Sequence, residues 1–162
     1  MLIQAELNAA INAEVGLEFF ASHQYVATAA WFEGQGLKLL AKMFYKQGSD
    51  ERDHAMKFIK YVVDTGGSVE IPAVSAPKSG FGSVEEAVQL ALTWELEVTK
   101  RCNDLMAMAI GHGDYAAQDF LRWFVTEQVE EVSTMENLLK IVRQVGPRNI
   151  IMVEAYLVHG GG

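Results

Sequence analysis

The sequence predicts an all-α protein, a four-helix bundle with one long crossover connection and a short fifth helix at the C-terminus. Apolar residues recur at steps of three and four residues over four long segments, as in helices that bury one face. The first and second segments, and the third and fourth, are joined by short links, whereas seventeen residues separate the two pairs. A shorter apolar segment follows the fourth helix.

The first two predicted helices cover residues 5–33 and 37–65. Gly34 and Gly36 interrupt the helical pattern between them, and so short a link joins antiparallel neighbours. We therefore expect the two helices to form a hairpin.

The segment from Gly66 to Gly82 is rich in glycine and proline, which is typical of a loop. Extended, its seventeen residues span roughly 55 Å, whereas a helix of about 28 residues is only about 42 Å long. The loop can therefore cross the whole bundle. Ser83, followed three residues later by Glu86, forms a capping box that starts the next helix.

The third and fourth predicted helices cover residues 83–111 and 114–145, and Gly146-Pro147 ends the fourth. The bundle of residues 5–145 and a short helix at 147–158 are expected to form a single domain of residues 1–162. Because the bundle is complete before the last helix, we expect its apolar residues to contact another subunit. These residues are Ile150, Ile151, Val153 and Leu157.

The composition narrows the class of protein. With 50% hydrophobic and 21% charged residues the chain reads as an ordinary globular protein, and every long helical segment carries charges, so no membrane span is expected. The net charge of −8 disfavours a nucleic-acid partner. A single cysteine excludes a disulfide framework. The first residues do not resemble a secretion signal, so we expect a cytoplasmic protein.

Each of the four apolar stripes is interrupted near its middle by a carboxylate. An uncompensated buried carboxylate costs several kcal/mol, and no lysine or arginine lies on these stripes. Two divalent cations would cancel four such charges. A Glu-x-x-His pair on the inward face of a helix is also typical of di-metal bundles. The candidate ligands are Glu18, Glu51, His54, Glu95 and Glu131.

With these residues in place, the chain resembles the non-haem ferritins of the prokaryotic type over nearly its whole length. The matching motifs are Leu17-Glu18 with Tyr25, Asp50-Glu51-Arg52-Asp53-His54, Trp94-Glu95 and residues 120–131. The resemblance implies a ferritin-like bundle that oxidises Fe(II) with dioxygen. It also implies a homo-oligomeric hollow shell of twenty-four subunits that stores ferric mineral.

The resemblance also implies a role for each candidate residue. Glu18 and His54 would be terminal ligands of the first iron, with Glu51 as the bridge to the second. Glu95 and Glu131 would bind the second iron, which lacks a histidine and should be held more loosely. Two residues beside the irons, Tyr25 as an electron donor and Gln128 next to the second iron, complete the predicted site.

A third iron site is a further expectation. Asp50, Glu127 and Glu130 match the family's cavity-facing site, although a solvated pair is an equally good reading of Glu127 and Glu130. Haem is not expected, because Arg52 stands where bacterioferritins carry the ligating methionine. Glu14 shares the first stripe with Glu18 and could in principle be the ligand instead; the resemblance selects Glu18, and we expect Glu14 at the bundle end or at an interface.

Two other functions fit the same pattern. The chain could be a di-iron peroxidase or oxygenase that keeps its metals, although such enzymes usually have two histidines at the site. It could also be a helical structural protein whose buried carboxylates pair with another group. The sequence leaves open whether storage or detoxification is the main task, and by which routes iron enters and leaves.

Overall fold

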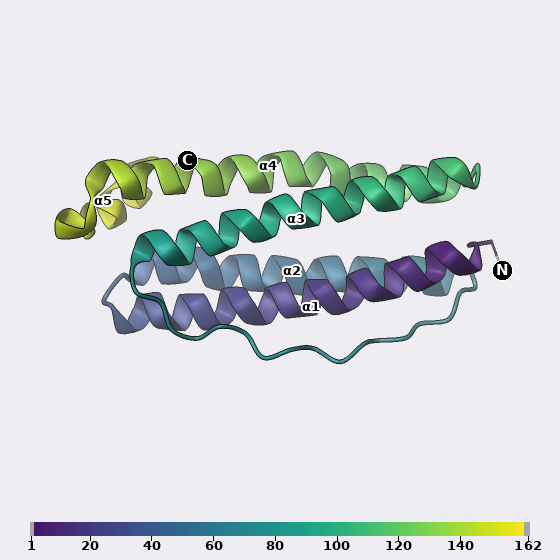
Figure 1. Ribbon diagram of the computed structural model, residues 1–162, viewed down its shortest axis with the longest axis horizontal. Helices are drawn as coiled ribbons and strands as arrows, with labels where there is room; N and C mark the ends of the chain where they lie inside the picture. The colour runs from purple at the N-terminus through teal and green to yellow at the C-terminus, as the bar shows by residue number, and fades with distance from the viewer. Residues whose placement is uncertain (1, 161–162) are drawn as a thin grey trace.

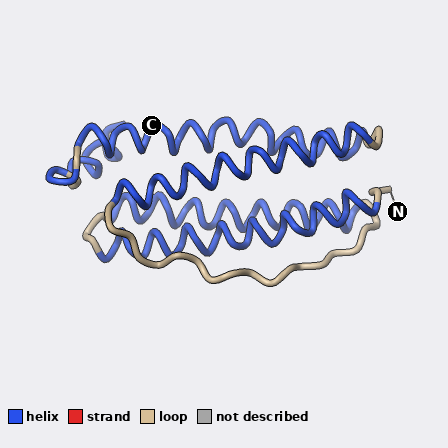
Figure 2. Tube along the Cα trace, in the orientation of Figure 1, coloured by secondary structure: helices blue, strands red, loops and turns tan. Residues whose placement is uncertain are grey.

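A computed structural model describes residues 2–160, and in that range it contains helices joined by loops, without strands (Figures 1 and 2). None of these helices is long and apolar enough to cross a lipid bilayer. The four long helices begin and end within one residue of their predicted limits. The elements are α1 (Ala5–Gly34), α2 (Lys38–Asp64), α3 (Val84–Gly111), α4 (Tyr115–Val145), the 3-10 turn η1 (Pro147–Asn149) and α5 (Met152–Gly160).

The four long helices form two antiparallel hairpins, α1 with α2 and α3 with α4 (Figure 1). The crossover between the hairpins runs along α1 for the length of the bundle, so that α2 and α3 point the same way (Figure 1). This is the connectivity of ferritin-like bundles, and it confirms the predicted fold class.

Side chains of α1 hold the crossover in place. The amide nitrogens of Asn8 and Asn12 both donate to the carbonyl of Ser68, at 2.9 and 2.8 Å. Farther along α1, Gly16 lets the loop approach closely, because a Cβ atom there would lie 2.5 Å from Cγ of Pro72. The crossover is therefore fixed by hydrogen bonds, by the close approach of Pro72 to α1, and by Val69 and Phe81, which pack on the apolar core.

The apolar core consists of two clusters, one at each end of the bundle. Phe32 and Phe44 lie in the cluster near α5, and Phe58 and Phe124 lie in the cluster at the opposite end. Between the clusters the inward side chains are polar and buried, and they come from all four long helices. These residues are Glu18, Gln47, Glu51, His54, Glu95, Gln128 and Glu131.

The C-terminal segment differs from its prediction in two ways. Pro147–Asn149 forms a 3-10 turn, and the α-helix begins only at Met152, so the short fifth helix is present but starts five residues later than predicted. Val153 is fully buried against its own bundle, and Ile150 and Leu157 pack on the same cluster. Of the four residues expected to contact another subunit, only Ile151, at 60% exposure, is well exposed.

Candidate metal centre

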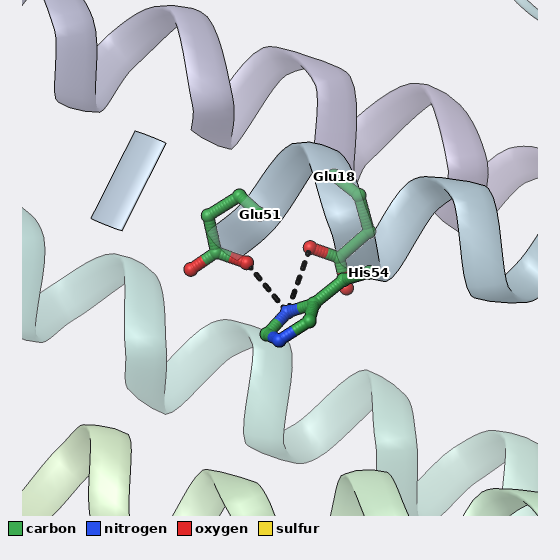
Figure 3. A group of neighbouring side chains, drawn as sticks. All are labelled: Glu18, Glu51 and His54. Carbon is green, nitrogen blue, oxygen red and sulfur yellow. Dashed lines mark hydrogen bonds and ion pairs between the residues drawn. The ribbon is translucent and has the colours of Figure 1, made fainter. Parts of the chain in front are cut away.

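Three predicted ligands meet inside the bundle between α1 and α2. Glu18, Glu51 and His54 each offer a ligand atom within 4.8 Å of the others, and they are the only such group of three among residues 2–160. Nδ1 of His54 lies 2.8 Å from Oε2 of Glu51 and 3.8 Å from Oε2 of Glu18 (Figure 3). All three residues are at most 5% exposed.

The local backbone explains this meeting. Glu51 and His54 are three residues apart on α2 and therefore share one face. One turn earlier, Gly48 lets α1 come close, because a Cβ atom there would lie 2.9 Å from Cγ2 of Val26. Oγ of Ser22 donates to the carbonyl of Gly48 at 2.6 Å and ties the two helices together.

Glu18 is the clearest sign of a cation site. Both of its carboxylate oxygens are buried without a hydrogen-bond partner. Burial, followed by the negative charges of Glu51 and Glu14, raises its pKa well above the usual range. A buried carboxylate in this setting needs a proton or a cation. Carboxylates with one imidazole suit iron or manganese, whereas closed structural zinc sites are typically rich in cysteine.

The carboxylates of α3 and α4 have hydrogen-bond partners. Glu95 is fully buried, accepts a hydrogen bond from the Tyr25 hydroxyl and receives one from Nε2 of Gln128 at 3.4 Å. Glu131 accepts a hydrogen bond from Nε2 of Gln47 at 2.6 Å. The two predicted ligands of the second iron are thus held by neutral donors.

The buried polar side chains between the two apolar clusters form a polar layer, and the electrostatics of this layer favour added positive charge. Burial, and then the charge of Glu51, raise the pKa of Glu95 to about 9. Burial also raises the pKa of Glu131, against the hydrogen bond from Gln47. For His54, burial opposes the charged form, but the hydrogen bond and charge of Glu51 prevail and the pKa rises. Without a metal, protons balance charges that cations would balance.

The residues of the expected third site lie nearer the surface. Asp50 forms an ion pair with Lys46, Glu127 is half-buried and Glu130 is exposed. The hydrogen bond to Asp50, and then the charges of Asp50, Glu131 and Glu127, raise the pKa of Lys46. The Lys46 ammonium is therefore paired with Asp50, one of the three expected ligands, and the third site stays a prediction.

Two features of the layer were not predicted. Gln47 lies on the α2 stripe four residues before Glu51, and its polarity among apolar neighbours was the signal that it belongs to the site. Glu14 is not at a bundle end or interface: its Oε2 lies 3.1 Å from Nε of Arg101, inside the bundle. Arg101 reaches Glu14 from the flank of α3, where the apolar periodicity of the sequence does not reveal it.

Comparisons with known proteins agree with this geometry. The ferritin-like domain family matches residues 8–145. Ferritin BfrB of Mycolicibacterium smegmatis is 37% identical over 155 residues, which are 96% of this chain and 85% of the relative. The bacterial non-heme ferritin of Staphylococcus aureus is 37% identical over 145 residues, which are 90% of this chain and 87% of the relative.

A solved structure, the open pore ferritin of Archaeoglobus fulgidus, superposes with a TM-score of 0.93 at 31% identity and covers 98% of both chains. The chain belongs to the ferritin-like family. Membership of this family supports iron storage, and a ferroxidase role is typical of the family.

Proposed function

We propose that this chain is an iron-storage ferritin subunit that oxidises Fe(II) with dioxygen at the polar layer of its bundle. The observation that carries the proposal is the pair of unpartnered oxygens of Glu18, buried beside Glu51 and His54. In a protein core such a carboxylate needs a proton or a bound cation, and a cation can serve all three side chains at once. Iron is the substrate here, since the family membership supports storage of that metal.

The ligands divide into two sets that share Glu51. Glu18, Glu51 and His54 would hold the first Fe(II), while Glu95 and Glu131 would hold the second. Each of the two Fe(II) ions supplies one electron. These two electrons, together with two protons, reduce dioxygen to hydrogen peroxide. Binding at the second set must displace or rearrange the hydrogen bonds that Glu95 and Glu131 now accept. The second iron should therefore bind more weakly and leave more readily.

The chain residues contribute position and charge to this reaction. The carboxylates gather negative charge in a water-poor layer, which stabilises Fe(III) more than Fe(II). Gln128 and Gln47 orient the second set through their amide donors. The protein thereby sets the positions of the two ions, and the redox chemistry is that of iron.

We further propose a homo-oligomeric shell of twenty-four subunits that stores the mineral. The ferritin relatives that match nearly the whole chain support an assembled protein. Exposed apolar residues at the C-terminal end offer a contact surface, namely Ile151, Met152, Tyr156 and Val158. The shell size and the cytoplasmic location remain predictions.

The substitution Glu51→Ala tests the proposal, because it removes the ligand shared by both ions. It should abolish fast Fe(II) oxidation, followed by oxygen consumption and the absorbance of Fe(III), while circular dichroism shows the same helix content. Glu136→Ala, on the exposed side of α4, is the matched control and should oxidise Fe(II) normally. Normal rates in Glu51→Ala would refute the di-iron assignment.

A further inference from the structure

A pocket between α1 and α3 leads toward the proposed metal centre. It has a volume of about 180 Å³ and is lined mainly by Phe20, Ala21, Tyr25, Leu90, Ala91 and Trp94. We call it the Tyr25 pocket. Figure 1 shows α1 and α3 side by side on one face of the bundle, with the crossover passing below them. Nothing in the proposed ligand sets uses this space.

The inner wall of the Tyr25 pocket contacts the metal-binding layer directly. Tyr25 is 3% exposed, and its hydroxyl donates to Oε1 of Glu95, a proposed ligand of the second iron. Ala21 and Ala91 are small, and their size leaves the space open beside the tyrosine ring. A guest in this pocket is thus separated from Glu95 by one side chain.

The lining offers nothing to a cation. Oγ1 of Thr28 donates to the carbonyl of Gln24 at 2.8 Å, and the side-chain amide of Gln24 is engaged with the backbone of Lys78 on the crossover, at 2.8 Å for both bonds. Among the described residues of the lining, the one buried polar atom without a partner is Nε1 of Trp94, which is a donor. A metal ion needs acceptors and strongly disfavours an apolar lining.

A small neutral molecule fits these walls. Apolar cavities of about 150 Å³ stay dry and take up guests such as xenon. Dioxygen is neutral, apolar and far smaller than this pocket, and it is the second substrate of the proposed reaction. We propose that the Tyr25 pocket is the route and holding site for dioxygen on its way to the metal centre. This inference rests on the proposed function.

The inference separates the paths of the two substrates. Fe(II) must travel along oxygen ligands, whereas dioxygen enters through an apolar wall that excludes Fe(II). Filling the pocket should therefore affect the dependence of the rate on dioxygen and leave metal binding unchanged. Filling it should raise the apparent KM for dioxygen, and widening it should lower that KM.

The experiment uses the full protein and three variants. Ala91→Leu fills the pocket, and Leu90→Ala widens it. Ala13→Leu is the matched control, because it makes the same change as the filling variant in a different pocket, of 270 Å³, between α1 and the crossover. Crystals pressurised with xenon report the guest directly, stopped-flow oxidation at varied dioxygen reports the apparent KM, and anaerobic Co(II) titration reports metal binding.

The inference predicts xenon in the Tyr25 pocket of the parent and of Ala13→Leu, and none in Ala91→Leu. The apparent KM for dioxygen should rise several-fold in Ala91→Leu and not in the control, with Co(II) binding unchanged in both. Should Ala91→Leu fail to fold, xenon in the parent and a lower KM in Leu90→Ala support the same conclusion.

Two results would overturn it, and they are distinct from failure of the ferroxidase proposal. An absence of xenon from the parent pocket, or an unchanged dioxygen dependence in both pocket variants, would show that dioxygen uses another route. In either case a parent that oxidises Fe(II) rapidly keeps its ferroxidase assignment. A parent that binds Co(II) but does not oxidise Fe(II) would instead contradict the proposed function itself.

Discussion

Within the polar layer, identical side chains differ in their partners. Neither carboxylate oxygen of Glu18 has a hydrogen-bond partner, whereas Glu95 and Glu131 each receive a hydrogen bond from a neutral side chain. A free buried carboxylate gains most from a cation, because a partnered one must first give up its hydrogen bond. We therefore expect Glu18, grouped with Glu51 and His54, to belong to the tighter of the two proposed sites.

Tyr25 connects the metal layer with the Tyr25 pocket. Burial, and then the charge of Glu95, raise its pKa well above the usual range, so the hydroxyl stays protonated. Tyr25→Phe keeps the ring and removes the hydroxyl, which we expect to supply a proton and an electron. The first di-iron reaction should proceed, and later turnovers should slow or release more peroxide.

Stopped-flow kinetics, electron paramagnetic resonance and a peroxide assay would measure these effects. Tyr61→Phe is the matched control, since the Tyr61 hydroxyl has no hydrogen-bond partner in the structure. If the parent forms no tyrosyl radical and turnover is unchanged in Tyr25→Phe, then Tyr25 is a packing residue only.

At the expected third site, Lys46 would compete with a cation for Asp50. Lys46→Met removes the ammonium that pairs with Asp50 and should strengthen binding of a third divalent ion roughly fivefold, or about 1 kcal/mol, as for unit charges near 4 Å apart in water. Calorimetric titration with Mn(II) measures the change. Lys42→Met, one turn earlier on α2, should have no such effect. If Lys46→Met binds Mn(II) with unchanged affinity, Lys46 does not influence a third site.

At the scale of elements, α5 completes the start of α2. α2 has no side-chain cap of its own. Instead the carboxylate of Glu154 accepts hydrogen bonds from the backbone nitrogens of Leu39 and Leu40, at 2.7 and 3.3 Å. The negative charge of a carboxylate also interacts favourably with the partly positive N-terminal end of a helix dipole. The last helix is therefore a structural part of its own subunit.

Glu154→Ala should lower the free energy of unfolding by about 1 kcal/mol, the usual loss for a missing N-cap. Chemical denaturation of the apo protein measures it. Glu154→Gln retains an acceptor and should lose less. If both variants unfold like the parent, the contact between α5 and α2 does not contribute to stability.

At the scale of the whole molecule, the polar layer divides the core and makes stability depend on pH. The pKa of Glu95 rises from 4.5 in the unfolded chain to about 9, so the folded state holds more protons between these values. Stability must then fall as the pH increases through this range, by at most about 1.4 kcal/mol per pH unit for each such group. His54 acts in the same direction: its raised pKa stabilises the fold below about pH 6.5 and ceases to do so above the folded pKa.

Thermal unfolding of the apo protein should therefore show a falling Tm between about pH 5.5 and about pH 8.5. Saturating Zn(II), which is not oxidised, should remove most of this slope because it replaces the bound protons. Glu95→Gln should flatten part of the slope without metal. A Tm of the apo protein that rises over the same range would contradict the electrostatics described for the layer.

The sequence by itself determined the four long helices, the crossover and the candidate ligands. Helical periodicity is local, so the apolar steps and the glycine breaks were enough to place the helices within one residue. Carboxylates on apolar stripes were informative because burying charge is costly, which is a property of the residue and its face. The same reasoning placed Glu51 and His54 in the buried layer, and the resemblance to the ferritins selected Glu18 over Glu14 on the first stripe.

The tertiary structure decided what depends on distances between helices. The pairing of Glu14 with Arg101 and the hydrogen bond from Gln47 to Glu131 both depend on how far a flexible side chain reaches toward another helix. The path of the chain after Gly146 turned α5 onto its own bundle, and the small side chains of Ala21 and Ala91 left the Tyr25 pocket open. No local pattern encodes these contacts, because each forms between segments far apart in the chain.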